Sequence, residues 1–161
     1  MKDYDEILVS LRRIMRAADL HSQKLMKESG LTAPQLLVMQ AIEKEGSPST
    51  STLARSIAVS LATMTRIIDR LERGGLVRRE KASVDKRVVN ISLTDAGRKK
   101  LESAPEPLQE EFLREFRKLE DWERQMLKSS LLRIAKMMDA EDIDAAPILQ
   151  TGAIVEVPKD S

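Results

Sequence analysis

The stretch between Ser49 and Leu93 restricts the possible folds most, because helix start signals, a tight turn and two strand-like runs follow one another in it. Ser49 or Thr50 can cap a helix over STLARSIA, and after the interruption VS, Ser60 can cap a second helix over LATMTRIIDRLERGG. Such hydroxyls accept a hydrogen bond from a free backbone N–H of the first helical turn. The pattern predicts two helices joined by a tight turn.

Two short runs, LVRREK and RVVNISL, follow the helix pair and have the length and composition of strands. Val89, Ile91 and Leu93 alternate on one face of the second run. The polar loop from Ala82 to Lys86 separates the two runs. We therefore expect an antiparallel β-hairpin directly after the second helix.

Helices are also expected before this stretch. Apolar residues recur with a 3.6-residue period from Tyr4 to Ser29, and Gly30 is expected to end that helix. A capping box at Thr32 starts another helix, which Gly46 closes. The first helix has a second, weaker apolar stripe on its opposite side, so it is expected to lie between its own core and a partner.

The part of the chain after the hairpin is predicted to be helical as well. Thr94 caps a charged helix that two nearby prolines must break. Helical periodicity returns over 108–119 and 122–138, with Asp121 as the expected cap between these segments. The tail beyond Ala140 contains Ile148, Leu149, Ile154 and Val155 and is too apolar for a simple solvated terminus.

Composition favours helices and excludes several kinds of function. Hydrophobic residues make up 42% of the 161 residues but aromatic residues only 2%, and Leu, Ile, Ala and Met dominate. No apolar run reaches the roughly 18 residues of a membrane span, and the start MKDYDE lacks signal-peptide features. A cytoplasmic protein without membrane contact is expected. With no cysteine and one histidine, we expect no metal site, no cofactor and no enzyme.

Positive charge is concentrated in one part of the chain. Residues 49–100 hold 12 Lys and Arg against 5 Asp and Glu, whereas residues 101–161 hold 8 against 14. Because phosphate groups attract Lys and Arg, this distribution favours DNA as the partner of the central segment. The alternative is a module that uses the same fold to bind protein, which would not require such a concentration of cations.

The helix after Ser60 has two distinct faces on a helical wheel. Its apolar face is expected to pack on the preceding helix. On the opposite face small residues come first and arginines last, which suits insertion into a DNA groove. The apolar residues are Met64, Ile67, Ile68 and Leu71, and the outward-facing residues are Ala62, Arg66, Asp69, Arg70 and Arg73.

At the predicted hairpin tip, Asp85 and Arg87 are two residues apart, with Lys86 between them. On an extended strand both side chains would point the same way, so the carboxylate could hold the guanidinium in one orientation. An arginine aimed in this way suits a narrow minor groove, whose negative potential attracts it. An ordinary surface ion pair is the alternative.

The segments LARSIAVSLATMTRIIDRLERGGLVRRE and DKRVVNISLTDAG resemble the MarR family of bacterial winged helix-turn-helix repressors. The family pattern is present in order: leucine-alanine, a turn, a Ser/Thr-rich recognition helix ending in Asp-Arg-Leu-Glu, then Gly-Leu-Val, Asp-x-Arg and Leu-Thr-x-x-Gly. The resemblance covers about residues 32–100. It implies a mainly α fold with a small β-hairpin wing, flanked by N- and C-terminal dimerisation helices.

The resemblance also implies a homodimer that binds a pseudo-palindrome in double-stranded DNA and releases it when a small-molecule effector binds. On this basis residues 1–30 and 104–140 are the dimerisation helices and residues 31–103 the winged helix-turn-helix domain. Residues 141–161 form a C-terminal tail.

By position in the family pattern, the start of the recognition helix would meet the major groove and Arg87, braced by Asp85, the minor groove. Leu61 and Ala62 stand where many relatives have more polar or smaller residues. The predicted DNA-binding residues are Ser60, Ala62, Thr63, Thr65, Arg66, Arg70, Arg73, Asp85, Lys86 and Arg87.

Three residues of the first helix are candidates for binding the effector: Arg13, Arg16 and His21. In the MarR family, which this sequence resembles, ligands tend to bind between the dimerisation helices and the winged domain. His21 flanks the apolar face of the first helix, close to that region. A structural histidine is the common alternative. Arg13 and Arg16 lie beside the weaker apolar stripe, where they could bind an anionic ligand; we favour the alternative of salt bridges to the acidic C-terminal part of a partner subunit.

Overall fold

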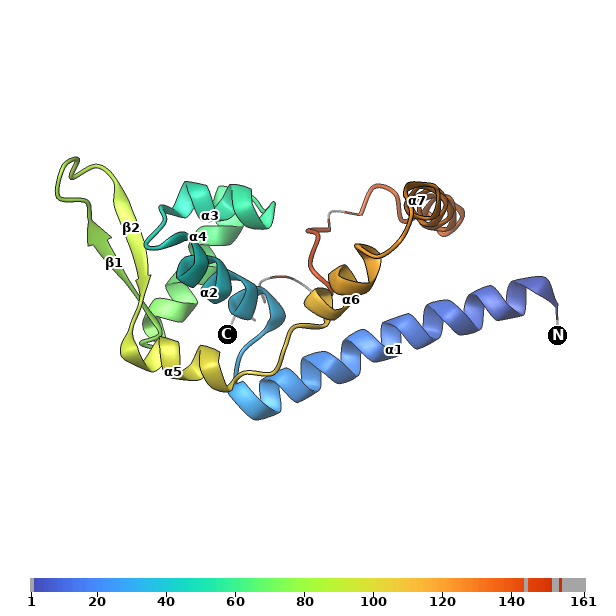
Figure 1. Cartoon of the computed structure of the whole chain (residues 1–161), viewed down its shortest axis with the longest axis horizontal. Helices are drawn as coiled ribbons and strands as arrows, with labels where there is room; N and C mark the ends of the chain where they lie inside the picture. Colours follow the sequence, from blue (N-terminus) through green and yellow to red (C-terminus); the bar gives the residue numbers. More distant parts are fainter. Residues whose placement is uncertain (1, 144, 152–153, 155–161) are drawn as a thin grey trace, which may run out of the picture.

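The computed structural model describes residues 2–143, 145–151 and 154 of the chain. Within them, helices flank one antiparallel pair of strands (Figure 1). In chain order the elements are α1 (Asp3–Ser29), α2 (Ala33–Glu45), α3 (Thr50–Ile57), α4 (Leu61–Arg73), β1 (Val77–Lys81), β2 (Val89–Leu93), α5 (Asp95–Ser103), α6 (Leu108–Phe116) and α7 (Asp121–Met137). This order confirms the predicted fold class of a mainly helical, winged helix-turn-helix protein.

The helix-turn-helix forms from local signals. The Ser49 side chain caps α3 by accepting a hydrogen bond from the backbone N–H of Thr52 at 3.2 Å. The Ser60 side chain caps α4 in the same way through Thr63, at 3.0 Å. Between the helices Ala58 adopts a left-handed conformation with φ of 58°, which turns the chain sharply enough to bring α4 against α3.

The wing is a two-stranded hairpin that is anchored at its base. Residues Val77 to Lys81 pair with Leu93 to Val89 in antiparallel register. Ile91 is completely buried, and its backbone N–H donates to the carbonyl of Pro48 at 2.8 Å, which joins β2 to the segment before α3. At the base, the Thr94 hydroxyl donates to the carbonyl of Gly75 at 2.6 Å. The wing and the helix-turn-helix therefore share one body.

The hydrophobic core lies inside this winged domain. It is built from the apolar faces of α2, α3 and α4, from the inward residues of both strands, and from Leu25 near the end of α1. Its completely buried members include Val38, Met39, Leu53, Met64 and Ile68. Ile148 of the C-terminal tail also belongs to it, at 9% exposure. The expectation that the tail is more than a solvated terminus is therefore confirmed for this residue, whereas Val155 lies outside the described residues.

The outer helices bury little of their apolar surface within one chain. In α1 the buried residues are Ala18, Leu25 and Ser29, and neither α6 nor α7 has a buried residue. In Figure 1, α1 extends far beyond the winged domain, and α7 is seen end-on above the N-terminal half of α1. Exposed large apolar residues of these helices include Ile7, Leu8, Ile14, Met15, Phe112, Trp122, Leu131 and Leu132.

Two short connections join the outer helices to the winged domain. The first follows Gly30, which ends α1 in a left-handed conformation with φ of 69°. The second contains residues 104–107, between α5 and α6, where the two prolines end the helical path as predicted. Close to this second connection, Nε2 of His21 accepts a hydrogen bond from the backbone N–H of Leu108 at 3.0 Å.

Two predicted helix boundaries near the C-terminus were wrong. The helix predicted over 108–119 ends at Phe116, because residues 117–119 form the turn that leads to α7. The cap of α7 is Glu120 and not Asp121. Glu120 has the extended backbone of a cap, and its N–H donates to Oε2 of Glu123 at 2.7 Å, so the capping box forms one residue earlier.

Candidate DNA-binding surface

The predicted recognition helix, α4, has the two faces that the helical wheel indicates. Met64, Ile67, Ile68 and Leu71 are at most 2% exposed and pack in the core. On the other side, Ala62, Thr65, Arg66 and Arg73 are exposed, and Thr63 is half-buried. The inner face thus fixes the helix to the domain and leaves both ends of its outer face accessible, at Ala62 to Arg66 and at Arg73.

Hydroxyl groups at the start of α4 are partly occupied by the helix itself. The Ser60 hydroxyl donates to Oγ1 of Thr63 at 2.9 Å and caps the helix. The Thr65 hydroxyl donates to the carbonyl of Leu61, also at 2.9 Å. Because Ser60 and Thr65 have used their own O–H donors, they can offer DNA only oxygen lone pairs and, for Thr65, a methyl group. The O–H of Thr63 remains available as a donor, and Arg66 presents an exposed cation nearby.

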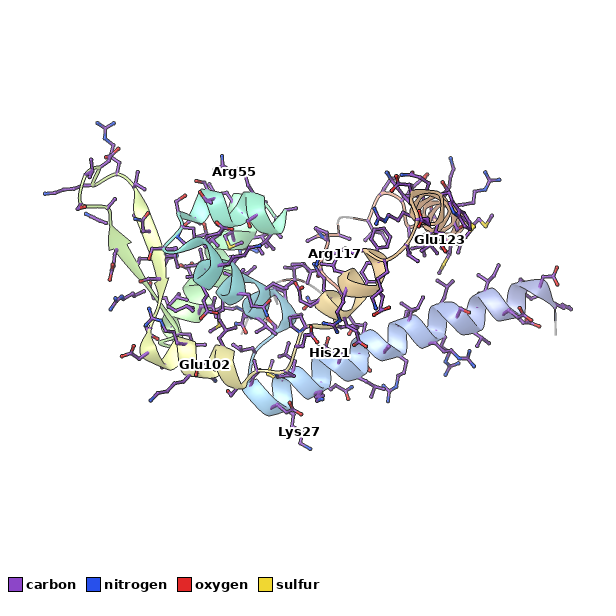
Figure 2. The ribbon with its side chains drawn as sticks, viewed as in Figure 1. His21, Lys27, Arg55, Glu102, Arg117 and Glu123 are labelled. Carbon is purple, nitrogen blue, oxygen red and sulfur yellow. The ribbon has the colours of Figure 1, made fainter. Side chains whose placement is uncertain are left out.

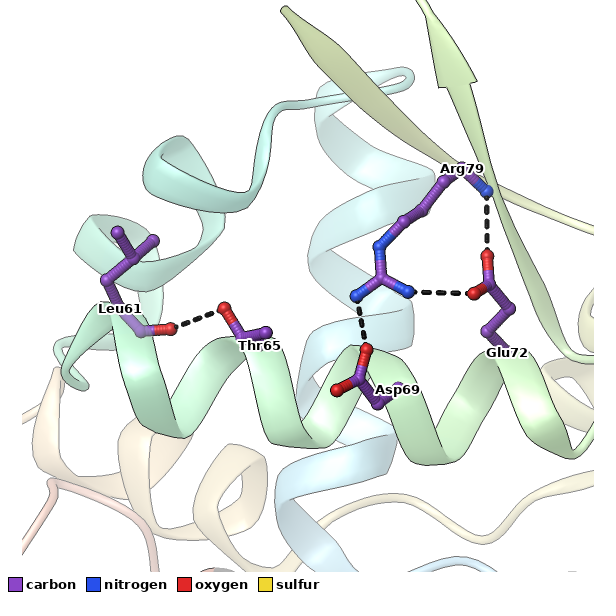
Figure 3. A network of polar contacts seen from close by, with 5 residues as sticks. All are labelled: Leu61, Thr65, Asp69, Glu72 and Arg79. Atoms are coloured by element: carbon purple, nitrogen blue, oxygen red, sulfur yellow. Dashed lines mark hydrogen bonds and ion pairs between the residues drawn. The ribbon is translucent and has the colours of Figure 1, made fainter.

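Arg79 on β1 ties the wing to α4 (Figure 3). Its guanidinium donates to Oδ1 of Asp69 at 2.6 Å and to Oε1 of Glu72 at 2.8 Å. Its backbone N–H donates to the other carboxylate oxygen of Glu72 at 3.2 Å. Because the guanidinium is planar and rigid, its two hydrogen bonds to two carboxylates form together only when the helix and the strand are in one relative position.

Arg79 keeps its positive charge in this network. Burial acts to lower the pKa of Arg79, but the hydrogen bonds and charges of Asp69 and Glu72 outweigh it, and the pKa of Arg79 is raised above its ordinary value. The prediction that Asp69 faces outward is therefore incomplete, because its carboxylate is used inside the domain. The spacing of Asp69 and Glu72, three residues apart on one side of a helix, was the available signal.

The wing tip differs from the prediction made for it. Asp85 and Arg87 do not lie on an extended strand but in a turn, closed by a hydrogen bond from the N–H of Val88 to the carbonyl of Asp85 at 3.0 Å. Oδ1 of Asp85 accepts the backbone N–H of Arg87 at 3.0 Å, whereas Nε of Arg87 is 4.0 Å away from it. The carboxylate thus shapes the turn, and the guanidinium, with a side chain 95% exposed, is free to reach outward. Lys86 is exposed beside it.

Arg70 lies apart from the other predicted DNA-binding residues. It is half-buried and lines a cavity of about 140 Å³ between α1, α2 and α4. Met26 of α1, Ala33 of α2 and Ile67 of α4 contribute to its wall. This environment differs from the exposed position of Arg66 and Arg73 on the same helix.

The three candidate effector-binding residues do not gather into one site. His21 lies where α1 passes α6 and serves as the acceptor for Leu108 (Figure 2), which supports the structural alternative. Arg16 is paired with Asp19 of its own helix at 2.7 Å, and Arg13 is exposed. A shallow hollow on α1 is lined by Arg16 and, from the tail, Thr151.

The described residues contain neither a candidate metal site nor a candidate membrane-spanning helix. No group of three or more His, Asp or Glu side chains among them could hold a metal ion. Within the same residues, no helix combines the length and apolar character that crossing a bilayer requires.

A family model described as the MarR family matches residues 31–89, which run from the start of α2 through the wing tip. The HTH-type transcriptional repressor MdtR of Bacillus subtilis (strain 168) is 32% identical over 106 residues, 63% of this chain and 68% of that protein. A MepR-like protein, solved in complex with pseudoligands, superposes with a TM-score of 0.58 at 28% identity and covers 86% of this chain and 97% of that one.

FabT of Streptococcus pneumoniae, solved in complex with DNA, shares the fold, with a TM-score of 0.54, 21% identity and coverage of 85% of this chain and 98% of that chain. The relatives are named as transcriptional regulators, which confirms the expectation that this chain is not an enzyme. The family model, the identity to MdtR and the winged helix-turn-helix fold agree, and the chain belongs to the MarR family.

Proposed function

We propose that this MarR-family regulator acts in the cytoplasm as a homodimeric repressor that binds a pseudo-palindromic operator and releases it when a small-molecule effector binds. The observation that carries this proposal is the position of Arg79, which holds an exposed recognition helix and a cationic wing in one rigid unit. The DNA complex of FabT, a protein with the same fold, supports the choice of ligand.

Exposed apolar surface supports the homodimer. Eight large apolar residues of α1 are 40% exposed or more, and α6 and α7 add a further set that no other part of the described chain covers. Apolar faces of this extent are stable in water when a second copy covers them. We therefore assign dimerisation to residues 1–30 and 104–140, and DNA binding to residues 31–103.

The roles of the DNA-facing residues follow from their exposure. We assign the major groove to the start of α4, with Thr63 as a hydrogen-bond donor, Arg66 as a cation and Ala62 and Thr65 as apolar contacts. Ser60 contributes mainly as a helix cap. Arg73 would meet the phosphate backbone. At the wing, Lys86 and Arg87 would enter or border the minor groove, where a cation is favoured by the negative potential.

The test is binding to the DNA upstream of the gene for this chain. A dimer should need two half-sites about 34 Å apart, one helical turn. Affinity should fall as salt rises, with a log-log slope of about −0.9 for each phosphate contacted. Binding that does not respond to salt, or no binding to any such segment, would instead favour the protein-interaction module.

The effector site is proposed to lie between α1 and the winged domain, beside the cavity that Arg70 lines. An effector lowers DNA affinity only if it binds the form with misplaced recognition helices better than the DNA-bound form. This coupling is reciprocal, so saturating operator must weaken effector binding by the same factor. A ligand whose affinity ignores operator would refute this mechanism.

A further inference from the structure

Residues 145–151 of the C-terminal tail lie between the winged domain and α6. Ile148 is inserted into the core at 9% exposure, and Ala146 and Ile154 pack against the same core. The backbone N–H of Leu149 donates to Oε1 of Gln109 on α6, at 3.4 Å. One short segment thus contacts both parts of the molecule that must move relative to each other during regulation.

This segment also forms a wall of two cavities. The cavity of about 140 Å³ between α1, α2 and α4 is bounded by Gln150, Thr151 and Ile154 of the tail. A second cavity, of about 350 Å³ between α2, α3 and α6, is bounded by Pro147 and Ile148. If the tail undocked, both cavities would lose a wall, and the apolar surface beneath Ile148 would be exposed.

The tail is attached in a way that permits undocking. Ile148 is the buried residue among those described beyond Ala140, while Ala145, Pro147, Leu149 and Thr151 are exposed. Backbone hydrogen bonds inside the segment are short-range: the N–H of Ile148 donates to the carbonyl of Ala146, and that of Gln150 to the carbonyl of Ile148. Because residues 145–151 belong to no strand or helix of the domain, they can leave without breaking a ladder or a helical turn.

We propose that the tail is a built-in competitor for the effector site, an inference that rests on the proposed effector-regulated function. An effector that enters the cavity between α1, α2 and α4 must displace Gln150, Thr151 and Ile154, which form its wall. Because Gln150 and Thr151 follow Ile148 closely in the chain, their displacement also draws Ile148 out of the core and breaks the contact of Leu149 with α6. The ligand class is an apolar molecule with one acidic group, because Met26, Ala33 and Ile67 offer apolar surface and Arg70 a cation. The apparent effector affinity is then the intrinsic affinity multiplied by the fraction of molecules in which the tail is undocked.

The chain has no cysteine, so a single introduced thiol can report on the tail. Ile148→Cys places the thiol in the core, and Leu149→Cys, at a position 39% exposed, is the matched control. With the thiol reagent DTNB, we expect the thiol at 148 to react at least about ten-fold more slowly than the thiol at 149, because burying one such side chain favours docking by about that factor. The probe is 8-anilinonaphthalene-1-sulfonate, an apolar aromatic anion.

Saturating probe should raise the reaction rate at 148 to that at 149 and leave the rate at 149 unchanged. A chain without residues 146–161 should bind the probe about ten-fold more tightly than the full chain, with circular dichroism and sedimentation confirming the same fold and oligomer. Equal probe affinity of both chains, no binding by the shortened chain, or a rate at 148 that ignores the probe overturns the proposal. Operator titrations in parallel test the proposed function separately, since failure to bind DNA leaves the thiol and probe results unaffected.

Discussion

Arg79→Met tests whether the wing and the recognition helix act as one unit. Methionine keeps part of the apolar stem but removes both guanidinium hydrogen bonds, at 2.6 Å to Asp69 and 2.8 Å to Glu72. The Arg79 side chain is 28% exposed, and the carboxylates are 38% and 41% exposed, so water replaces much of what is lost. After this discount we expect the free energy of unfolding to fall by about 1 to 2 kcal/mol.

The effect on DNA should go beyond stability. With the wing no longer fixed to α4, we expect operator affinity to fall by about ten-fold, or 1.4 kcal/mol, at a temperature where the variant is fully folded. Because Arg79 is used inside the domain and does not touch phosphate, the slope of log affinity against log salt should stay unchanged. By contrast, Arg66→Ala should make that slope less steep by about 0.9 for each phosphate contact removed.

Chemical denaturation and fluorescence anisotropy with labelled operator measure both quantities. Arg79→Lys is the matched control, because it keeps the charge but lacks the planar fork that reaches two carboxylates at once. We expect it to restore only a small part of the affinity. Native affinity and native stability in Arg79→Met, or full rescue by lysine, would refute the view that this fork positions the wing.

Three other substitutions examine separate parts of the structure. Arg87→Ala should weaken operator binding by about 1 to 3 kcal/mol with an unchanged melting curve, since its side chain is 95% exposed; unchanged binding would make the wing tip an ordinary charged surface. Leu132→Glu, at a residue 62% exposed on α7, should shift the dimer towards monomer in sedimentation experiments, and a dimer of native strength would place the interface elsewhere. Gly97→Ala should destabilise the domain by about 2 to 4 kcal/mol, because a Cβ there would overlap the backbone carbonyl of Leu76. Gly74→Ala, whose Cβ would meet nothing closer than 3.5 Å, is its control and should melt close to the native temperature.

Sequence alone was sufficient wherever the structure depends on neighbouring residues. The caps at Thr32, Ser60 and Thr94 each satisfy a backbone N–H three residues ahead, so their positions are visible in the sequence. The inward face of β2 follows from simple alternation, which Ile91 and Leu93 confirm. These elements required no knowledge of what lies across the domain.

The predictions failed where a residue's role depends on a distant or bent part of the chain. A helical wheel correctly placed Asp69 away from the core but could not show that Arg79 would cross from β1 to meet it. Strand geometry was assumed for Asp85 and Arg87, whereas a hydrogen-bonded turn separates them from both strands. Apart from its apolar side chain, Ile148 has no local signal for its insertion into a core whose other buried residues lie no later in the chain than Leu93.

The two connections between the outer helices and the winged domain define an axis about which the domain can pivot. Gly30 and residues 104–107 supply the few torsion angles that would change, while the hydrogen-bonded body around α4 stays intact. With 13 residues, α4 is about 20 Å long, so a pivot of about 6° displaces one end relative to the other by about 2 Å. That is enough to separate a hydrogen-bonded pair. Substitutions that alter operator affinity without touching DNA should therefore be found at these two connections, where small angles are amplified into lost contacts.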